Sequence, residues 1–341
     1  MEKHIKMVSV NCCGEVGDVI VDGVSSPPGK TIAEKAEFLR KDGNLWQFVS
    51  NEPRGGVFKH INLLVPPVNP DANSGFIIME PLDLPPMSGS NSICVTTVLL
   101  ETGILPMQGP YTTIKLEAPA GTITAVASCK EEKVTQVKIQ NLQSFMVEVD
   151  KKIVIPDIGE LVVSTAFGGD SFVLVENNQL GLDLIPKNAN KIVEICSKIV
   201  KAVNNQLGFS HPLIPNLNCV SFCMIMDEIK TNEKGEKTAK NTVCIRPKKL
   251  DRSPCGTGSS ARLAYLFHKK KISLNEKFIS KSILGTEFEC KILHSEIKEG
   301  VVCITPEFSG VAHITGEQTL YIDEHNPFPL GYRLTDTWPE D

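Results

Sequence analysis

Two short loops of the sequence hold the residues whose types could carry out acid–base chemistry. Each loop places a hydroxyl or a thiol first, then glycine, then serine or threonine, and each leads into an apolar run that predicts a helix. The loops are Ser88-Gly89-Ser90 and Cys255-Gly256-Thr257. The first turn of a helix has unpaired N–H groups and a positive dipole end, and glycine lets the backbone approach a ligand closely. Two such loops facing one another would bind a carboxylate from both sides.

Cys255 is the candidate base. The field at the helix start is expected to lower the pKa of its thiol and to favour the thiolate, which is a competent proton acceptor. Other interpretations stay open at this point, because the loop could be an ordinary turn and a single cysteine before a helix is most often structural. A nucleotide site is disfavoured, since no lysine follows in the P-loop position. A cysteine-protease site is disfavoured as well, since no histidine is offered by the local sequence.

An internal repeat strengthens the case for both loops. Each half of the chain runs through a glycine-containing turn into a strand, then a helix, then one of the two loops, then an apolar run. The turn, helix and loop fall at 12–14, 31–41 and 88–90 in the first half, and at 167–170, 188–207 and 255–257 in the second. This order predicts two pseudosymmetric lobes facing each other, with Ser88 and Cys255 in equivalent places.

The elements that must position the loops are mostly strands. Twelve runs rich in Val, Ile, Thr and Phe are bounded by Gly, Pro or Asn, which is typical of β-structure. They are 6–10, 19–21, 61–65, 75–79, 122–126, 134–139, 161–164, 171–176, 220–226, 242–245, 287–293 and 301–305. The helix over 31–41 opens with Thr31 and Glu34 at capping-box spacing and stops at Gly43. The helix over 188–207 carries an apolar face and stops at Gly208. The chain is therefore expected to be α+β.

Composition narrows the class of protein. The 341 residues are 41% hydrophobic and carry a net charge of −5, which argues for two soluble domains and against nucleic-acid binding. No run approaches the roughly 18 apolar residues of a membrane span, and the start lacks the apolar core of a signal peptide. The 11 cysteines predict reduced thiols in the cytoplasm, and their spacing disfavours a metal site. His211 is a lesser site candidate, and a structural role at a turn is the better interpretation.

The octapeptide Asp251-Arg252-Ser253-Pro254-Cys255-Gly256-Thr257-Gly258 resembles the second active-site loop of the proline racemase family. That family includes proline racemases, 4-hydroxyproline 2-epimerases and trans-3-hydroxy-L-proline dehydratases. Further segments resemble other family signatures, so that the resemblance covers nearly the whole chain. These segments are 51–55, 167–169, 310–316 and 326–331.

The resemblance implies a diaminopimelate-epimerase-like fold of two pseudosymmetric lobes, each a curved sheet around a central helix. The first lobe would comprise 1–160 plus about 320–341 and carry Ser88, and the second would comprise 161–319 and carry Cys255. The resemblance also implies no cofactor, a homodimer, and a hydroxyproline as the small-molecule substrate. Asp251 would hold the ring ammonium. The carboxylate would be bound by Gly89, Ser90, Gly256 and Thr257.

The first loop departs from the racemase pattern of Met-Cys-Gly-His, because this chain has Met87-Ser88-Gly89-Ser90. A serine hydroxyl is a poor base without a partner that takes its proton, so a two-thiol racemase is disfavoured. The primary expectation is therefore dehydration of trans-3-hydroxy-L-proline to Δ1-pyrroline-2-carboxylate. Cys255 would take the α-proton and help the hydroxyl on the same ring face to leave, and Ser88 would be a hydrogen-bonding partner, a proton relay or a weak second acid. The alternatives are a 4-hydroxyproline 2-epimerase or proline racemase-type epimerase, and an inactive binding protein.

Overall fold

The computed structural model describes residues 4–211, 217–323 and 325–339. The chain forms two compact units. Unit 1 comprises Met1–Ile139 and Gly310–Asp341, and unit 2 comprises Gln140–Ser309. Each has its own hydrophobic core of buried aliphatic and aromatic side chains. No helix in the described part of the chain has the length and apolar character needed to cross a membrane.

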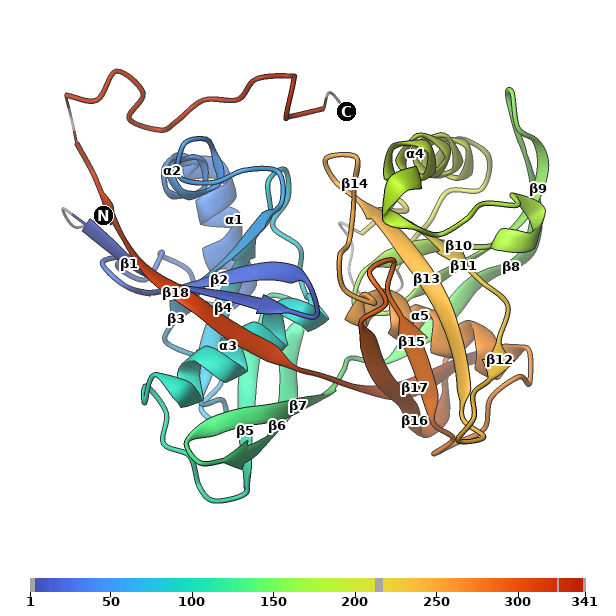
Figure 1. Cartoon of the computed structure of the whole chain (residues 1–341), viewed down its shortest axis with the longest axis horizontal. Helices are drawn as coiled ribbons and strands as arrows, with labels where there is room; N and C mark the ends of the chain where they lie inside the picture. The colour runs from blue at the N-terminus through green and yellow to red at the C-terminus, as the bar shows by residue number, and fades with distance from the viewer. Residues whose placement is uncertain (1–3, 212–216, 324, 340–341) are drawn as a thin grey trace. The chain divides into compact units, whose positions relative to one another are not determined.

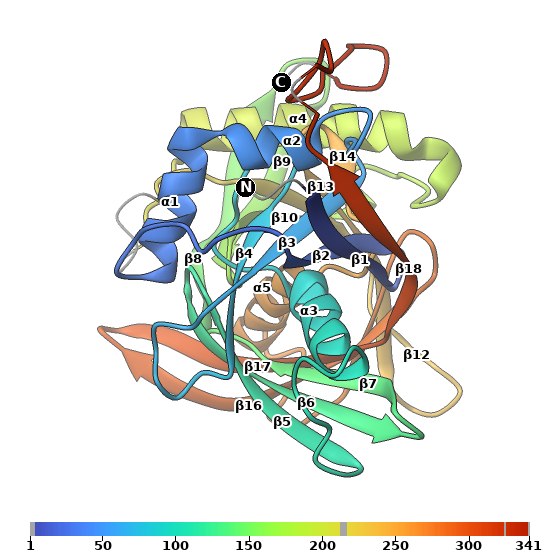
Figure 2. The ribbon, with the colours of Figure 1, turned by 90° about the vertical axis from the view of Figure 1, so that its left-hand side faces the viewer.

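Unit 1 is a curved sheet that packs around one central helix. Its strands are β1 (His4–Cys12), β2 (Glu15–Asp22), β3 (Lys59–Val65), β4 (Ser74–Met79), β5 (Tyr111–Ala118), β6 (Gly121–Lys130), β7 (Lys133–Gln140) and β18 (Ala312–Tyr321). Its helices are α1 (Ile32–Asp42), α2 (Asn44–Ser50) and α3 (Gly89–Glu101). Helix α3 packs against β1, β2, β6 and β18, whereas α1 packs against α2 and β4. Figure 2 shows α3 with β1 and β2 on one side of it and β5 and β6 on the other.

Unit 2 is a closed barrel. Its strands are β8 (Ser144–Ile155), β9 (Gly159–Phe167), β10 (Ser171–Glu176), β11 (Phe222–Met226), β12 (Lys230–Thr231), β13 (Lys237–Ile245), β14 (Lys249–Leu250), β15 (Phe278–Lys281), β16 (Glu287–Lys298) and β17 (Val301–Gly310). Pairing runs β8–β9–β10–β11–β13–β15–β16–β17 and returns to β8. Helix α5 (Gly256–His268) packs against β8, β9, β10 and β16, and α4 (Ala189–Gln206) packs against β8 and β11. Figure 1 labels these elements along the chain.

The strand pairing of the two units follows one pattern. In unit 1 the order β18–β1–β2–β3–β4–β5–β6 is antiparallel, antiparallel, parallel, antiparallel, parallel and antiparallel. In unit 2 the order β8–β9–β10–β11–β13–β15–β16 has the same senses in the same sequence. Helices α3 and α5 each come just before the strand that completes the fifth pairing of this pattern, which is parallel, namely β5 and β15. The internal repeat of the sequence is thus a repeat of topology.

Local sequence explains the helix ends. The backbone N–H of Glu34 donates to Thr31 Oγ1 at 3.0 Å, as the capping-box spacing predicts. Gly43 ends α1 in the left-handed region, with φ of 70°, where glycine carries no Cβ penalty. In α4 the apolar face buries Ile192, Ile199 and Val203, so period-3.6 patterning was sufficient to find this helix.

The unit boundaries lie earlier than expected. The second unit begins at residue 140 rather than 161, because β8 pairs with β9 and with β17 of the same unit. The chain returns to unit 1 at residue 310 rather than about 320, because all of β18 pairs with β1. Both strands are largely exposed on one side and charged or polar there, as in Glu148–Lys152, so their apolar patterning is weak.

Candidate functional site

Ser88 and Cys255 occupy the same position on two equivalent helices. Ser88 is the N-cap of α3, and Cys255 is the N-cap of α5. The backbone carbonyl of each accepts the first intrahelical bond, from Ser92 N at 3.0 Å and from Ser259 N at 2.8 Å.

The Cys255 thiol is held by the first turn of its own helix. The N–H of Gly258 donates to Cys255 Sγ at 3.3 Å, and Thr257 Oγ1 lies 3.7 Å from the sulfur. Cys255 has φ of 63° and ψ of 105°, an uncommon conformation for a residue with a side chain. Its own N–H donates to Ser253 Oγ at 3.0 Å, and the residue is 6% exposed. The sulfur is therefore buried at the amide end of α5.

The pKa of Cys255 is raised well above its ordinary value, which corrects the expectation of a lowered one. Burial is the largest cause, and the negative charge of Asp251 is the next. The hydrogen bonds from Gly258 and Thr257 act in the opposite direction but are outweighed. Helix-end amides alone do not produce a thiolate where the sulfur has lost its water and lies near a carboxylate.

Two glycines allow close packing at the thiol and at the first turn of α5. A methyl group added at Gly258 would lie 2.6 Å from Met224 Cε and 3.0 Å from Cys255 Sγ. A methyl group added at Gly168 would lie 2.1 Å from the carbonyl oxygen of Thr257. The turn between β9 and β10 therefore packs directly against the first turn of α5. These contacts explain why glycine occupies both positions.

Asp251 organises the loop that precedes the thiol. Its Oδ1 accepts a bond from the Ser253 N–H at 2.8 Å, and its own N–H donates to Val243 O at 2.8 Å. Asp251 is 6% exposed. Gly256 and Thr257, expected to bind a carboxylate, lie buried in the first turn of α5.

Ser88 is held by a side chain rather than by backbone. Ser88 Oγ accepts a bond from Asn91 Nδ2 at 2.9 Å, and Ser90 Oγ lies 3.5 Å away. Ser88 has φ of −146° and its side chain does not cap α3. Gly89 and Ser90 are buried in the first turn of α3, which is where the sequence places them as carboxylate-binding residues. The backbone of this loop therefore differs from that of the Cys255 loop.

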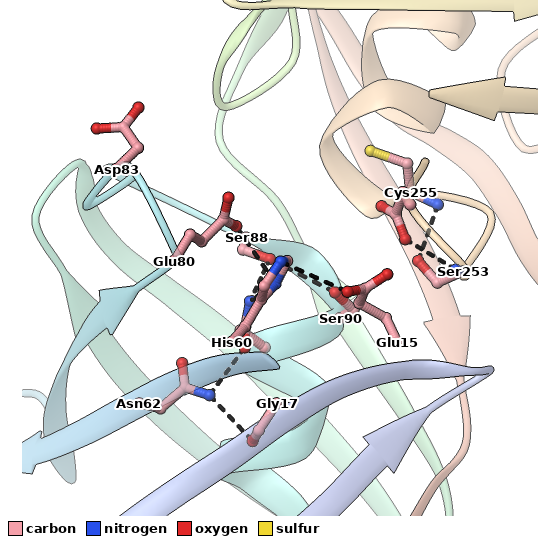
Figure 3. Close-up of polar contacts among 12 residues, drawn as sticks. Glu15, Gly17, His60, Asn62, Glu80, Asp83, Ser88, Ser90, Ser253 and Cys255 are labelled. Carbon is pink, nitrogen blue, oxygen red and sulfur yellow. Dashed lines mark hydrogen bonds and ion pairs between the residues drawn. The ribbon is translucent and has the colours of Figure 1, made fainter. Parts of the chain in front are cut away.

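A buried acid–imidazole cluster lies beside Ser88 (Figure 3). His60 Nε2 is 3.4 Å from Glu15 Oε1, and His60 Nδ1 is 3.4 Å from Glu80 Oε1. Asn91 Nδ2 lies 3.3 Å from His60 Nδ1. The three charged or chargeable residues are at most 5% exposed. Burial of two carboxylates is costly unless they are paired, so this cluster is a built feature of unit 1.

Sequence reasoning missed this cluster. The local sequence around Ser88 does not reveal it, because Glu15 lies in β2, His60 lies in β3 and Glu80 directly follows β4. Asn91 could have been found, because a residue three positions into a helix lies near its N-cap. The ring of His211 packs edge-on to Phe167 at 4.3 Å, and burial lowers the pKa of His211. Within the described residues, no cluster of three His, Cys, Asp or Glu side chains could hold a metal ion.

The two units define a fold with one repeated α/β topology, in which each candidate loop stands at the start of a helix. A solved phenazine biosynthesis protein of the PhzF family from Bacillus anthracis shares the fold, with 13% identity, a TM-score of 0.57, and coverage of 94% of this chain and 100% of that one. The family model described as proline racemase matches residues 7–333, and this chain belongs to that family.

Two solved family members are much more similar. One is a hydroxyproline epimerase from Agrobacterium vitis with bound trans-4-hydroxy-L-proline. It is 35% identical, with a TM-score of 0.91 over 98% of this chain and 97% of that one. The other is a probable proline racemase from Agrobacterium radiobacter K84 with bound carbonate, also 35% identical, with a TM-score of 0.91 over 98% of each chain.

Proposed function

We propose that this chain epimerises 4-hydroxyproline at C2, with Cys255 and Ser88 acting on one substrate molecule. The observation that carries the proposal is that two equivalent helices have a reactive group as their N-cap residue, a hydroxyl in α3 and a thiol in α5. Similarity to a hydroxyproline epimerase over nearly the whole chain supports the choice of substrate. This proposal places epimerisation, the alternative expectation from the sequence, ahead of dehydration.

Cys255 takes the α-proton as thiolate, and the electron pair left on C2 spreads into the substrate carboxylate. Backbone N–H groups at the two helix starts, in Gly89, Ser90, Gly256 and Thr257, stabilise the charge that develops on the carboxylate oxygens. The Ser88 hydroxyl then gives its proton to C2 from the opposite face, which inverts the configuration. Exchange with solvent removes the proton from sulfur and returns one to the serine oxygen.

Substrate binding would lower the raised pKa of Cys255 and so favour the thiolate that takes the α-proton. The charge of Asp251 is one cause of that raised pKa. A cationic ring nitrogen beside Asp251 would cancel this charge and lower the pKa of the thiol in the complex. The same carboxylate therefore both holds the substrate and ties thiolate formation to its arrival.

Dehydration of trans-3-hydroxy-L-proline is the second candidate function. One observation favours it, namely that serine stands where a second thiol would serve a symmetric racemase. In that substrate the α-hydrogen and the 3-hydroxyl share one ring face, so Cys255 alone could remove the proton and then protonate the leaving hydroxyl. The enamine product would tautomerise to Δ1-pyrroline-2-carboxylate.

One set of incubations separates the two functions. The purified chain is offered trans-4-hydroxy-L-proline, its C2 epimer and trans-3-hydroxy-L-proline in separate D₂O reactions. Chiral chromatography with mass detection follows inversion and deuterium at C2, and o-aminobenzaldehyde traps pyrroline. Inversion of the 4-hydroxyprolines with one deuterium gained supports the proposal. Pyrroline from the 3-isomer without any inversion would replace it with the dehydratase, and inactivity on all three substrates would leave a binding protein.

A further inference from the structure

Asn91 is the residue of α3 that touches the Ser88 hydroxyl. Its side chain is 1% exposed and makes three close polar contacts. Asn91 Oδ1 accepts from Asn62 Nδ2 at 2.8 Å, and Asn91 Nδ2 lies 2.9 Å from Ser88 Oγ and 3.3 Å from His60 Nδ1. An asparagine offers one acceptor and two donor hydrogens, so its orientation decides what Ser88 can do.

Main-chain carbonyl groups fix the orientation of the Asn91 side-chain amide through Asn62. Asn62 Nδ2 contacts the carbonyl oxygens of Gly17 at 3.0 Å and Asp18 at 3.3 Å, which can only accept. The group that Asn62 Nδ2 meets on Asn91 must then be the carbonyl Oδ1. The amide nitrogen of Asn91 consequently faces Ser88 and His60. A methyl group at Gly17 would lie 2.8 Å from Asn91 Oδ1, so glycine leaves room for the arrangement.

We propose that Asn91 is a positioning residue that commits Ser88 to donating its proton. The Ser88 oxygen accepts the amide hydrogen, which leaves the hydroxyl hydrogen free to point at a ligand or at Ser90. A bond donated to the oxygen also stabilises the negative charge left there after proton transfer. Ser88 is thereby set up to give a proton to the substrate, and in the reverse direction the same amide bond stabilises the serine oxygen that takes the proton back.

The acid–imidazole cluster also contacts the side-chain amide of Asn91, through His60. His60 Nδ1 lies 3.3 Å from the amide nitrogen of Asn91, and His60 Nε2 faces Glu15. Glu80 closes the cluster on the Nδ1 side. A side chain packed between a paired imidazole and a fixed asparagine has little freedom to turn over. The direction of the bond to Ser88 is therefore a property of the fold of unit 1.

The inference rests on the proposed function in one respect, because it takes Ser88 to be the group that reaches the substrate. Asn91→Asp tests it with almost no change of shape. The new carboxylate can still accept from Asn62, but it must also accept from Ser88, which turns the hydroxyl hydrogen inward. Loss of a placed donor costs about 10²-fold to 10³-fold in kcat, and we expect that loss with KM changed by no more than about threefold.

A second readout does not depend on turnover. In Ser88→Cys the new sulfur accepts the Asn91 amide bond, so adding Asn91→Asp replaces a donor with a negative charge and raises the pKa of the thiol. Alkylation of residue 88 by iodoacetamide at pH 8, measured on its peptide by mass spectrometry, is expected to slow at least tenfold, since one pKa unit is about tenfold in thiolate. Asn91→Ala in the same background is expected to slow it less. Asn241→Asp, a buried asparagine of unit 2, is the matched control and should leave it unchanged.

The outcomes separate the two proposals. Slower alkylation in a chain that turns over no hydroxyproline supports the role of Asn91 and rejects the proposed function. Unchanged alkylation in both Asn91 variants rejects the role of Asn91, even in an active enzyme. Faster turnover in Asn91→Asp also overturns it, because the amide bond donated to Ser88 would then not assist proton transfer. Far-UV circular dichroism checks the fold, and Asn91→Ala stands in if the aspartate variant fails to fold.

Discussion

The first turns of α3 and α5 hold the same kind of group at the same point of the fold but by different means. In α5 the third helical residue is Gly258, and its backbone N–H donates to the thiol. In α3 the third helical residue is Asn91, and its side-chain amide donates to the hydroxyl. A repeated topology therefore fixes where a reactive group sits, and one residue three positions later decides what surrounds it.

This difference matches the sizes and charges of the two groups. Sulfur is large, and a methyl group at Gly258 would lie only 3.0 Å from it. A hydroxyl is smaller and leaves space for an amide side chain backed by the His60 cluster. The thiol of unit 2 accordingly lies near the carboxylate of Asp251, whose charge raises the pKa of Cys255. The hydroxyl of unit 1 accepts a hydrogen bond from the Asn91 amide.

Cys255→Ser should cause the largest loss of activity, because it removes the chemical difference between the two N-cap residues. It gives both loops a hydroxyl, so no group with a reachable pKa is left to take the α-proton, and general-base catalysis of about 10²-fold to 10⁴-fold is lost. Initial rates on 4-hydroxyproline and 3-hydroxyproline measure the effect. Cys219→Ser, at a partly exposed cysteine of the same unit, should retain wild-type rates. Retained activity in Cys255→Ser would remove this residue as the base.

Gly258→Ala tests whether the thiol needs backbone and not a side chain at the third position. The added methyl group meets Met224 and the Cys255 sulfur, and overpacking of this kind costs about 1–3 kcal/mol of the free energy of unfolding. We expect a lowered melting temperature together with at least about a tenfold loss of kcat, because the sulfur is displaced. Gly316→Ala, where nothing lies within 4 Å of the added methyl group, should change neither. An unchanged melting temperature in Gly258→Ala would show that the loop adapts freely.

The positions of both loops could be predicted from sequence because they depend on local signals. Glycine after the reactive residue, an apolar helical run and the repeated order of elements are all readable along the chain. The capping bond between Thr31 and Glu34 is predictable for the same reason. Strands β8 and β18 were not found, since one face of each is exposed and polar.

The surroundings of each loop could not be predicted, because they depend on residues far apart in the chain. Glu15, His60 and Glu80 come together only when β2, β3 and β4 pair in register. The raised pKa of Cys255 has the same origin. The helix-start amides are visible in the sequence, whereas the burial that outweighs them is a property of the packed barrel.

Ser88→Cys sharpens the comparison by making the two N-caps chemically alike. The new thiol would accept the Asn91 amide bond, which favours its thiolate and allows it to act in both directions. We expect epimerisation of 4-hydroxyproline to rise by up to about tenfold, as thiols can exchange acid and base roles near neutral pH. Forward and reverse rates from the two C2 epimers measure it. No gain in either direction would mean that residues contacting the ring, and not this position, select the reaction.

Asp251→Asn should have the smallest of these effects. The informative result is the direction in which the alkylation rate of Cys255 changes. The pKa of Cys255 is raised by burial first and by the charge of Asp251 second. Below that pKa, kcat/KM of a thiolate-dependent enzyme rises about tenfold per pH unit. Removing the Asp251 charge lowers the pKa, so alkylation of Cys255 at pH 8 should quicken by a few fold, at most about tenfold.

The same substitution should raise KM for hydroxyproline, because the ring ammonium loses its counter-charge. General damage to the loop would not produce faster alkylation of Cys255 together with a higher KM. Glu228→Gln, at an exposed carboxylate of unit 2, should alter neither quantity. If Asp251→Asn left alkylation unchanged while KM rose, burial alone would set the thiol, and substrate binding would not promote thiolate formation through this carboxylate.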